Sequence, residues 1–139
     1  MPCYVDPERH QFEAFKKLPR DKPIMMINFL RFREKAAYED GREATGAEAY
    51  AAYGRESGQV FRRVGGQIIW RGKPEVMLIG PSDENWDLAF IAQYPTAGAF
   101  LEMLTDPDYQ VAVKHRQAAV LDSRLIRTSR IGEGEGFAG

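Results

Sequence analysis

Residues 24–32, with the sequence IMMINFLRF, constrain the fold of this chain more than any other segment. Successive side chains of a strand point to opposite faces, and here the side chains of both faces are mainly apolar. A strand covered on one side only alternates between apolar and polar residues, whereas a strand covered on both sides does not. We therefore expect this strand to be buried on both faces.

Local signals also place two long helices along the chain. Thr45 and Glu48 have the spacing of a capping box and predict the start of a helix that ends at the glycines of residues 65–66. Asp106 followed by Pro107 predicts the start of the other, because proline is favoured at the first helical position.

Further strands are predicted at residues 67–72, 75–80, 86–94 and 123–130, where apolar runs are bounded by turn residues. Pro74 separates the first two runs. Because proline cannot donate a hydrogen bond within a ladder, these two runs form either one bent strand or a tight pair.

A short helix is expected before this core. In the segment DPERHQFEAFKKLP, Asp6 is placed to cap the helix and Pro7 suits its first position. We expect one domain over residues 1–139, in which residues 1–20 form a helical extension and residues 129–139 form a flexible tail.

Without the opening helix, the predicted order is strand, helix, strand, strand, helix, strand, which is the order of the ferredoxin-like fold. We therefore predict an α+β protomer with a four-stranded antiparallel sheet and helices on one face. The other face would be bare, although residues 24–32 are apolar on both faces. A second copy of the sheet is the simplest cover, so the pattern predicts a homodimer.

Charge and motifs exclude several classes of partner. Nineteen Lys and Arg against twenty Asp and Glu leave no basic surplus for nucleic acid, and no apolar run is long enough to span a membrane. Cys3 is the only cysteine, and there is no His-x-x-x-His pair, dense carboxylate cluster or glycine-rich phosphate loop. We expect no metal and no cofactor. The N-terminus lacks a signal-peptide pattern, which predicts a cytoplasmic protein.

The helix after Pro107 contains the most informative candidate, Arg116, which interrupts an apolar stripe at helical spacing. A buried guanidinium needs an anionic partner or several acceptors, because its charge is costly to desolvate alone. The partner is either the carboxylate of a ligand or an internal carboxylate, Asp87 or Asp122. A third alternative is a guanidinium that reaches solvent along a buried stem.

Four other residues complete the candidate site. His115, next to Arg116, is the candidate acid–base catalyst, the alternative being a surface or interface histidine. Asn28 lies in the middle of its strand, where it either braces a loop or points into a pocket. Arg71 and Tyr50 are candidates for the wall of a ligand cavity, and aromatic residues of this kind are more commonly ordinary core.

Gly54 and Gly58 lie one turn apart on the helix that Thr45 begins. Each weakens a helix by about 1 kcal/mol relative to alanine, which suggests close approach of a backbone or a ligand. Tolerated glycines are the alternative.

Several blocks together resemble the family called domain of unknown function 1330. They are MMINFLRFREKAAYEDGREATGAEAYAAYG, GGQIIWRGKPEVMLIG, WDLAFIAQYP and AFLEMLTDPDYQVAVKHRQAAVLDSRLI, and the likeness covers about residues 20–128. The family belongs to the dimeric α/β-barrel superfamily, so the resemblance implies an eight-stranded barrel built from two ferredoxin-like protomers. It also implies a cavity between sheet and helices for a small organic molecule. No catalytic signature accompanies the resemblance.

Three functions fit these expectations. The first is a small-molecule-binding protein for a small organic anion. The second is a cofactor-independent monooxygenase or isomerase-like enzyme, and the third is a structural dimer without a ligand pocket. A cavity that contains Asn28, Arg71, His115 and Arg116 would favour the first two over the third.

Overall fold

The centre of the structure is a four-stranded antiparallel sheet with the strand order β2-β3-β1-β4. The computed structural model describes residues 2–138. In chain order its elements are α1 (Arg9–Lys17), β1 (Ile24–Phe32), α2 (Gly46–Arg63), β2 (Gln67–Gly72), β3 (Leu88–Tyr94), α3 (Ala97–Thr105), α4 (Pro107–Ala119) and β4 (Val120–Thr128). The predicted ferredoxin-like fold is confirmed.

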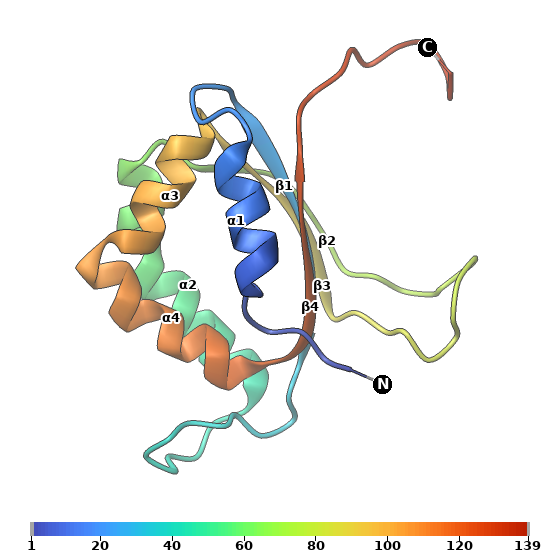
Figure 1. Cartoon of the computed structure of the whole chain (residues 1–139). Helices are drawn as coiled ribbons and strands as arrows, with labels where there is room; N and C mark the ends of the chain where they lie inside the picture. Colours follow the sequence, from blue (N-terminus) through green and yellow to red (C-terminus); the bar gives the residue numbers. More distant parts are fainter. Residues whose placement is uncertain (1, 139) are drawn as a thin grey trace.

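The helices lie on one side of the sheet (Figure 1). On this side β1 contributes the alternating buried residues Ile24, Met26, Asn28 and Leu30. Two apolar clusters form beneath the helices, one around Ile24 and Met26 and the other around Leu30. No helix within residues 2–138 has both the length and the apolar content that crossing a membrane requires.

The opposite side of the sheet, here called the open face, has no helix over it (Figure 1). An apolar row crosses all four strands there, because Trp70 pairs with Ile91, Ile91 with Ile27, and Ile27 with Ile126. Trp70 is 52% exposed and Ile126 is 49% exposed. β1 is thus covered on its helix side only, within one protomer.

Hydrogen bonds confirm the predicted start of α2. The Thr45 hydroxyl accepts from the Glu48 N–H at 3.0 Å, and the Glu48 carboxylate accepts from the Thr45 N–H at 2.8 Å. The helix ends just before Gly65, whose φ of +90° favours glycine.

The opening helix starts later than predicted. Its N-cap is Glu8, without a capping side chain, so the prediction that Asp6 caps it is wrong. The carboxylate of Asp6 instead accepts a hydrogen bond from the Gln117 side chain at 3.3 Å. A long-range contact of this kind leaves no trace in the local sequence pattern.

The predicted strand at residues 75–80 is also absent, and residues 73–87 form a loop that we call the arm. Val76, Leu78 and Ile79 of the arm are between 83% and 89% exposed. A strand needs neighbouring N–H and C=O groups with which to pair, and no strand within residues 2–138 of the same protomer pairs with these residues. The arm projects from the open face of the sheet (Figure 1).

Gly46 and Gly54, both in α2, provide a test of the packing. A Cβ atom at Gly46 would overlap the carbonyl oxygen of Arg33 and lie 2.9 Å from that of Ala119, whereas a Cβ atom at Gly54 would meet nothing within 4 Å. We predict that Gly46→Ala lowers the free energy of unfolding by about 1–3 kcal/mol. Gly54→Ala should raise it by about 0.5–1 kcal/mol, because alanine favours a helix.

Urea unfolding of both variants at equal protein concentration measures these changes. Equal stabilisation by the two substitutions would contradict the packing at Gly46.

Candidate functional site

A cavity of about 1490 Å³ lies between the sheet and the helices. The strands supply its floor, and all four helices and the chain before α1 supply its walls. The lining is rich in aromatic residues, which are Tyr4, Phe12, Phe15, Tyr50, Tyr53, Phe61, Phe90, Tyr94, Phe100 and Tyr109. Gly54 also lines the cavity, and no atom lies near the position of its absent side chain. At this glycine there is room for a ligand, not close approach of another backbone.

Tyrosine hydroxyls provide much of the polar chemistry of the cavity. The hydroxyls of Tyr53 and Tyr109 are 2.8 Å apart and share a hydrogen bond. Burial raises the pKa of both groups, and it also raises the pKa of Tyr50 and Tyr94. These four phenols therefore stay neutral at pH 7, where they donate and accept hydrogen bonds but do not act as bases.

Asn28 lies on the cavity wall, in the middle of β1. The side chain is buried, and its amide nitrogen donates to the carbonyl oxygen of Met26 at 3.1 Å. Of the two alternatives, a loop brace and a group in a pocket, its position fits the second.

Arg116 also lines the cavity, at the end of α4. One guanidinium nitrogen donates to the carbonyl oxygen of Val5 at 2.6 Å, and the other lies 3.4 Å from the hydroxyl of Ser123. Both partners are neutral. Within residues 2–138 no carboxylate forms an ion pair with Arg116.

The two carboxylates considered as internal partners are engaged elsewhere. Asp87 accepts from the N–H of Phe32 at 2.8 Å. Asp122 forms an ion pair with Arg124 at 2.7 Å and accepts from the N–H of Tyr4 at 2.9 Å. The alternative of an internal ion pair for Arg116 is therefore wrong.

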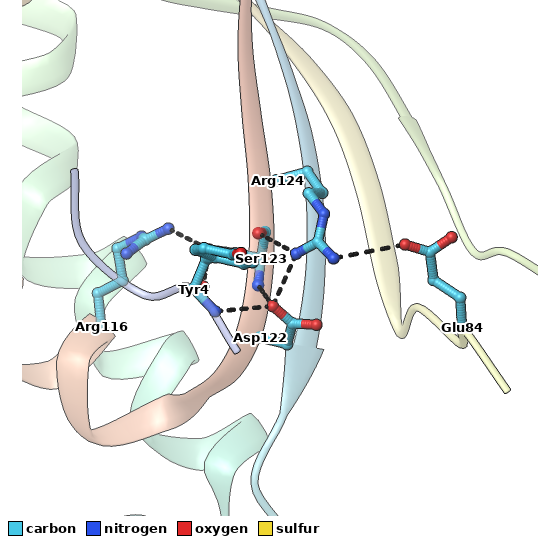
Figure 2. Close-up of polar contacts among 6 residues, drawn as sticks. All are labelled: Tyr4, Glu84, Arg116, Asp122, Ser123 and Arg124. Carbon is cyan, nitrogen blue, oxygen red and sulfur yellow. Dashed lines mark hydrogen bonds and ion pairs between the residues drawn. The ribbon is translucent and has the colours of Figure 1, made fainter. Parts of the chain in front are cut away.

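The chain before α1 is held against β4 by several hydrogen bonds. Besides the bond to Asp122, the carbonyl oxygen of Tyr4 accepts from the hydroxyl of Ser123 at 2.7 Å. Figure 2 shows Arg116 and Arg124 on opposite sides of β4, the first toward the helices and the second toward Glu84. Sequence reasoning missed this wall of the cavity, because its contacts join residues more than 100 positions apart.

Arg71 and Tyr50 line the cavity as well. Among the described residues, Arg71 forms neither an ion pair nor a side-chain hydrogen bond. Burial raises the pKa of Tyr50, and the positive charges of Arg116 and Arg71 oppose that rise. Both guanidinium charges thus act on one region of the cavity.

His115 does not line the cavity with Arg116, its neighbour in sequence. One ring nitrogen, Nδ1, lies 2.6 Å from the hydroxyl of Tyr38, and the other, Nε2, lies 2.7 Å from the carboxylate of Glu56. The histidine therefore joins α4 to α2 and to the connection after β1. Neighbouring residues of a helix point about 100° apart, and this rotation carries His115 away from the cavity.

A search of residues 2–138 for three or more His, Cys, Asp or Glu side chains placed to hold a metal ion finds no such group.

Comparison with solved structures identifies relatives of this fold. The chain is 56% identical to the protein RPA0582 of Rhodopseudomonas palustris, a protein of unknown function, whose methylated form superposes with a TM-score of 0.93 over 97% of this chain and 100% of that one. SnoaB, a cofactor-independent oxygenase from Streptomyces nogalater, is 17% identical, with a TM-score of 0.50 over 82% of this chain and 99% of SnoaB.

A dimeric ferredoxin-like protein of unknown function from Bacteroides fragilis is 12% identical, with a TM-score of 0.50 over 78% of this chain and 96% of that protein. These last two likenesses show the fold alone. None of the curated proteins compared with the chain matches it.

A family model for a domain of unknown function, DUF1330, matches residues 41–128, which include α2, α3, α4 and all strands except β1. The match begins later than residue 20, where the resemblance was expected to start, and ends at residue 128 as expected. The chain therefore belongs to the DUF1330 family.

Proposed function

We propose that the protein binds a small organic anion in the cavity between sheet and helices, with Arg116 as the principal contact of the anionic group. One observation carries the proposal: Arg116 and Arg71 both line an aromatic cavity, and neither has a carboxylate partner within residues 2–138. Hydrogen bonds between a guanidinium and a carboxylate are stronger than those to neutral oxygens. A ligand carboxylate would therefore form stronger hydrogen bonds with Arg116 than the neutral oxygens of Val5 and Ser123 form.

Asn28 and Tyr50 are proposed as supporting ligand contacts. Both lie on the cavity wall, and the hydroxyl of Tyr50 is subject to the charges of Arg116 and Arg71. Aromatic walls with a few polar groups are typical of sites for small molecules, in which the polar groups fix the orientation of the ligand. An aromatic carboxylate combines the two features that this lining would recognise.

The second candidate is a cofactor-independent enzyme, which the fold shared with SnoaB favours. General base catalysis at neutral pH needs a group with a pKa near 7 within reach of the substrate. The buried phenols have raised pKa values, and His115 is held by Tyr38 and Glu56 outside the cavity. Binding without turnover is therefore the function that we favour. The cavity argues against the third alternative, a dimer with a filled core.

We further propose that the protein is a homodimer through its open face. The apolar row from Trp70 to Ile126 is partly exposed, and such patches on a protomer commonly mark an interface. The related fold of Bacteroides fragilis is dimeric. In a two-fold dimer the same patch packs on itself, which would also cover the second face of β1.

The first prediction concerns Arg116→Gln, which removes the charge but retains a hydrogen-bond donor. Benzoate should bind to the unchanged protein more tightly than benzamide, its neutral analogue, and Arg116→Gln should remove this difference. Benzoate affinity should fall about tenfold to a hundredfold, which corresponds to the roughly 1.5–3 kcal/mol of a hydrogen bond to a charged group. Isothermal titration calorimetry measures both ligands.

Arg130→Gln is the matched control, because it makes the same charge change outside the cavity and should leave benzoate binding unaltered. A series of aromatic and aliphatic carboxylates of which none binds at millimolar concentration would contradict the anion site.

A second prediction separates His115 from the cavity. We expect His115→Ala to lower the free energy of unfolding by about 1–2 kcal/mol, because the hydrogen bonds to Tyr38 and Glu56 are lost. Benzoate affinity should stay unchanged. Thermal unfolding and calorimetry on the same variant measure the two effects. If the His115→Ala variant instead keeps its stability and loses benzoate binding, His115 takes part in the ligand site and the prediction is wrong.

A third prediction concerns assembly. Multi-angle light scattering should give the mass of a dimer. The interface should bury well over the roughly 1,000 Å² that is expected of a genuine contact. Ile126→Asp, on the open face, should give a monomer, because a charge would be buried at the interface. Val111→Asp is the control, since Val111 is 59% exposed on α4 and should leave the dimer intact. A monomeric unchanged protein would contradict the proposal.

A further inference from the structure

The arm, residues 73–87, has a sequence that the structure of one protomer does not explain. Its segment EVMLI, residues 75–79, has the composition of a strand. In an extended conformation Val76 and Leu78 would face one side and Met77 and Ile79 the other, so both sides would be apolar. This is the pattern of a strand covered on both faces, yet three of the four side chains are more than 80% exposed.

The backbone of this segment also lacks partners within the protomer. Among residues 2–138, no backbone hydrogen bond involves the N–H or C=O groups of residues 75–79. The sheet itself ends in two edge strands, β2 and β4, and in the part of the chain that the structure describes no strand pairs with their outer N–H and C=O groups. An unpaired strand-forming segment and an unpaired sheet edge are complementary in hydrogen bonding.

The position of the arm points to a second copy of this chain as its partner. The arm projects on the side of the open face, away from the helices (Figure 1). Its returning end lies on that face, where the ring of Trp86 packs against Phe29 at 5.9 Å and Glu84 pairs with Arg124 at 3.5 Å. The arm is thus continuous with the surface through which we propose dimerisation. Any copy that packs on the open face lies beside the arm.

We propose that the arm is a dimerisation arm: residues 75–79 add as a strand to an edge of the sheet of the second copy. Two-fold symmetry makes this exchange reciprocal, since each protomer donates one arm and receives one. The dimer then buries Val76, Leu78 and Ile79, which are exposed to water in the single protomer. This inference rests on the proposed dimer and adds to it the element that clasps the two protomers.

Hydrogen exchange tests the strand directly. In the unchanged protein the amides of residues 75–79 should be protected at high concentration and should exchange rapidly on dilution below the dimer dissociation constant. The Ile126→Asp monomer should show rapid exchange of these amides at every concentration. Amides of residues 75–79 that exchange rapidly in a protein shown to be dimeric would overturn the arm while leaving the dimer.

A triple variant tests the contribution of the side chains. Val76→Ser with Leu78→Ser and Ile79→Ser should weaken dimerisation about a hundredfold or more in analytical ultracentrifugation, given the apolar area removed. The substituted residues are exposed in the protomer, so circular dichroism should be unchanged. Ile131→Ser is the control, because Ile131 is 85% exposed outside the arm. Equal dissociation constants for the triple variant and the unchanged protein would overturn the inference.

The same measurements keep the two proposals apart. A protein that is monomeric at all concentrations would remove both the dimer and the arm. A triple variant that dimerises normally would overturn the arm proposal alone. The same holds if the three apolar side chains prove to bind a lipid surface, so that the variant loses only affinity for phosphatidylcholine vesicles. The benzoate experiment is independent of the arm, because residues 73–87 do not line the cavity.

Discussion

The central position of β1 is the constraint on which the rest of the structure depends. β1 pairs with β3 on one side and β4 on the other, so its backbone is held within the sheet and its side chains point alternately to the two faces. Neighbouring residues serve different surfaces: Asn28 lies on the cavity wall, whereas Ile27 lies in the apolar row of the open face. A strand that lines an aromatic cavity on one side and an apolar surface on the other is apolar almost throughout. A polar residue is tolerated at the centre only where the cavity gives it room and the Met26 carbonyl accepts its hydrogen bond.

The electrostatic character of the cavity depends on how Arg116 is held. Val5 and Ser123 fix the orientation of the guanidinium through neutral oxygens and leave its charge uncompensated. Arg124, on the other side of β4 from Arg116, shows the opposite arrangement, since its guanidinium lies 5.1 Å from the ring centres of Tyr4 and of Trp86 and pairs with Asp122 and Glu84. The two arginines are close in sequence and differ in what surrounds them. A charge that is already paired stabilises structure, whereas one that is oriented but unpaired is available to a ligand.

Local signals were sufficient for the order of the elements and insufficient for the site. The capping box at Thr45 and the Asp106-Pro107 start depend on residues a few positions apart, and both are present as predicted. The position of Arg116 on the cavity also followed from helical spacing. The hydrogen-bond partner of Arg116 could not be predicted in this way, because Val5 is 111 residues away in sequence. The absence of strand pairing for residues 75–79 could not be predicted either, because it depends on which strands lie nearby. His115 was misplaced relative to the cavity because the residue next to it in a helix points in another direction.

The balance of charges and hydrogen-bond groups explains why binding is a better hypothesis than turnover. The described lining of the cavity includes five arginines, among them Arg71 and Arg116, and phenols that burial keeps protonated, while Asp6 and Glu8 belong to the chain that forms one wall. Such a site supplies positive charge and hydrogen-bond donors, and a ligand that complements it must supply negative charge and acceptors. Proton abstraction would need a group that is unprotonated near pH 7 and faces the ligand. The imidazole best suited to that role is used to join α4 to α2 and to Tyr38, so its chemistry serves the fold.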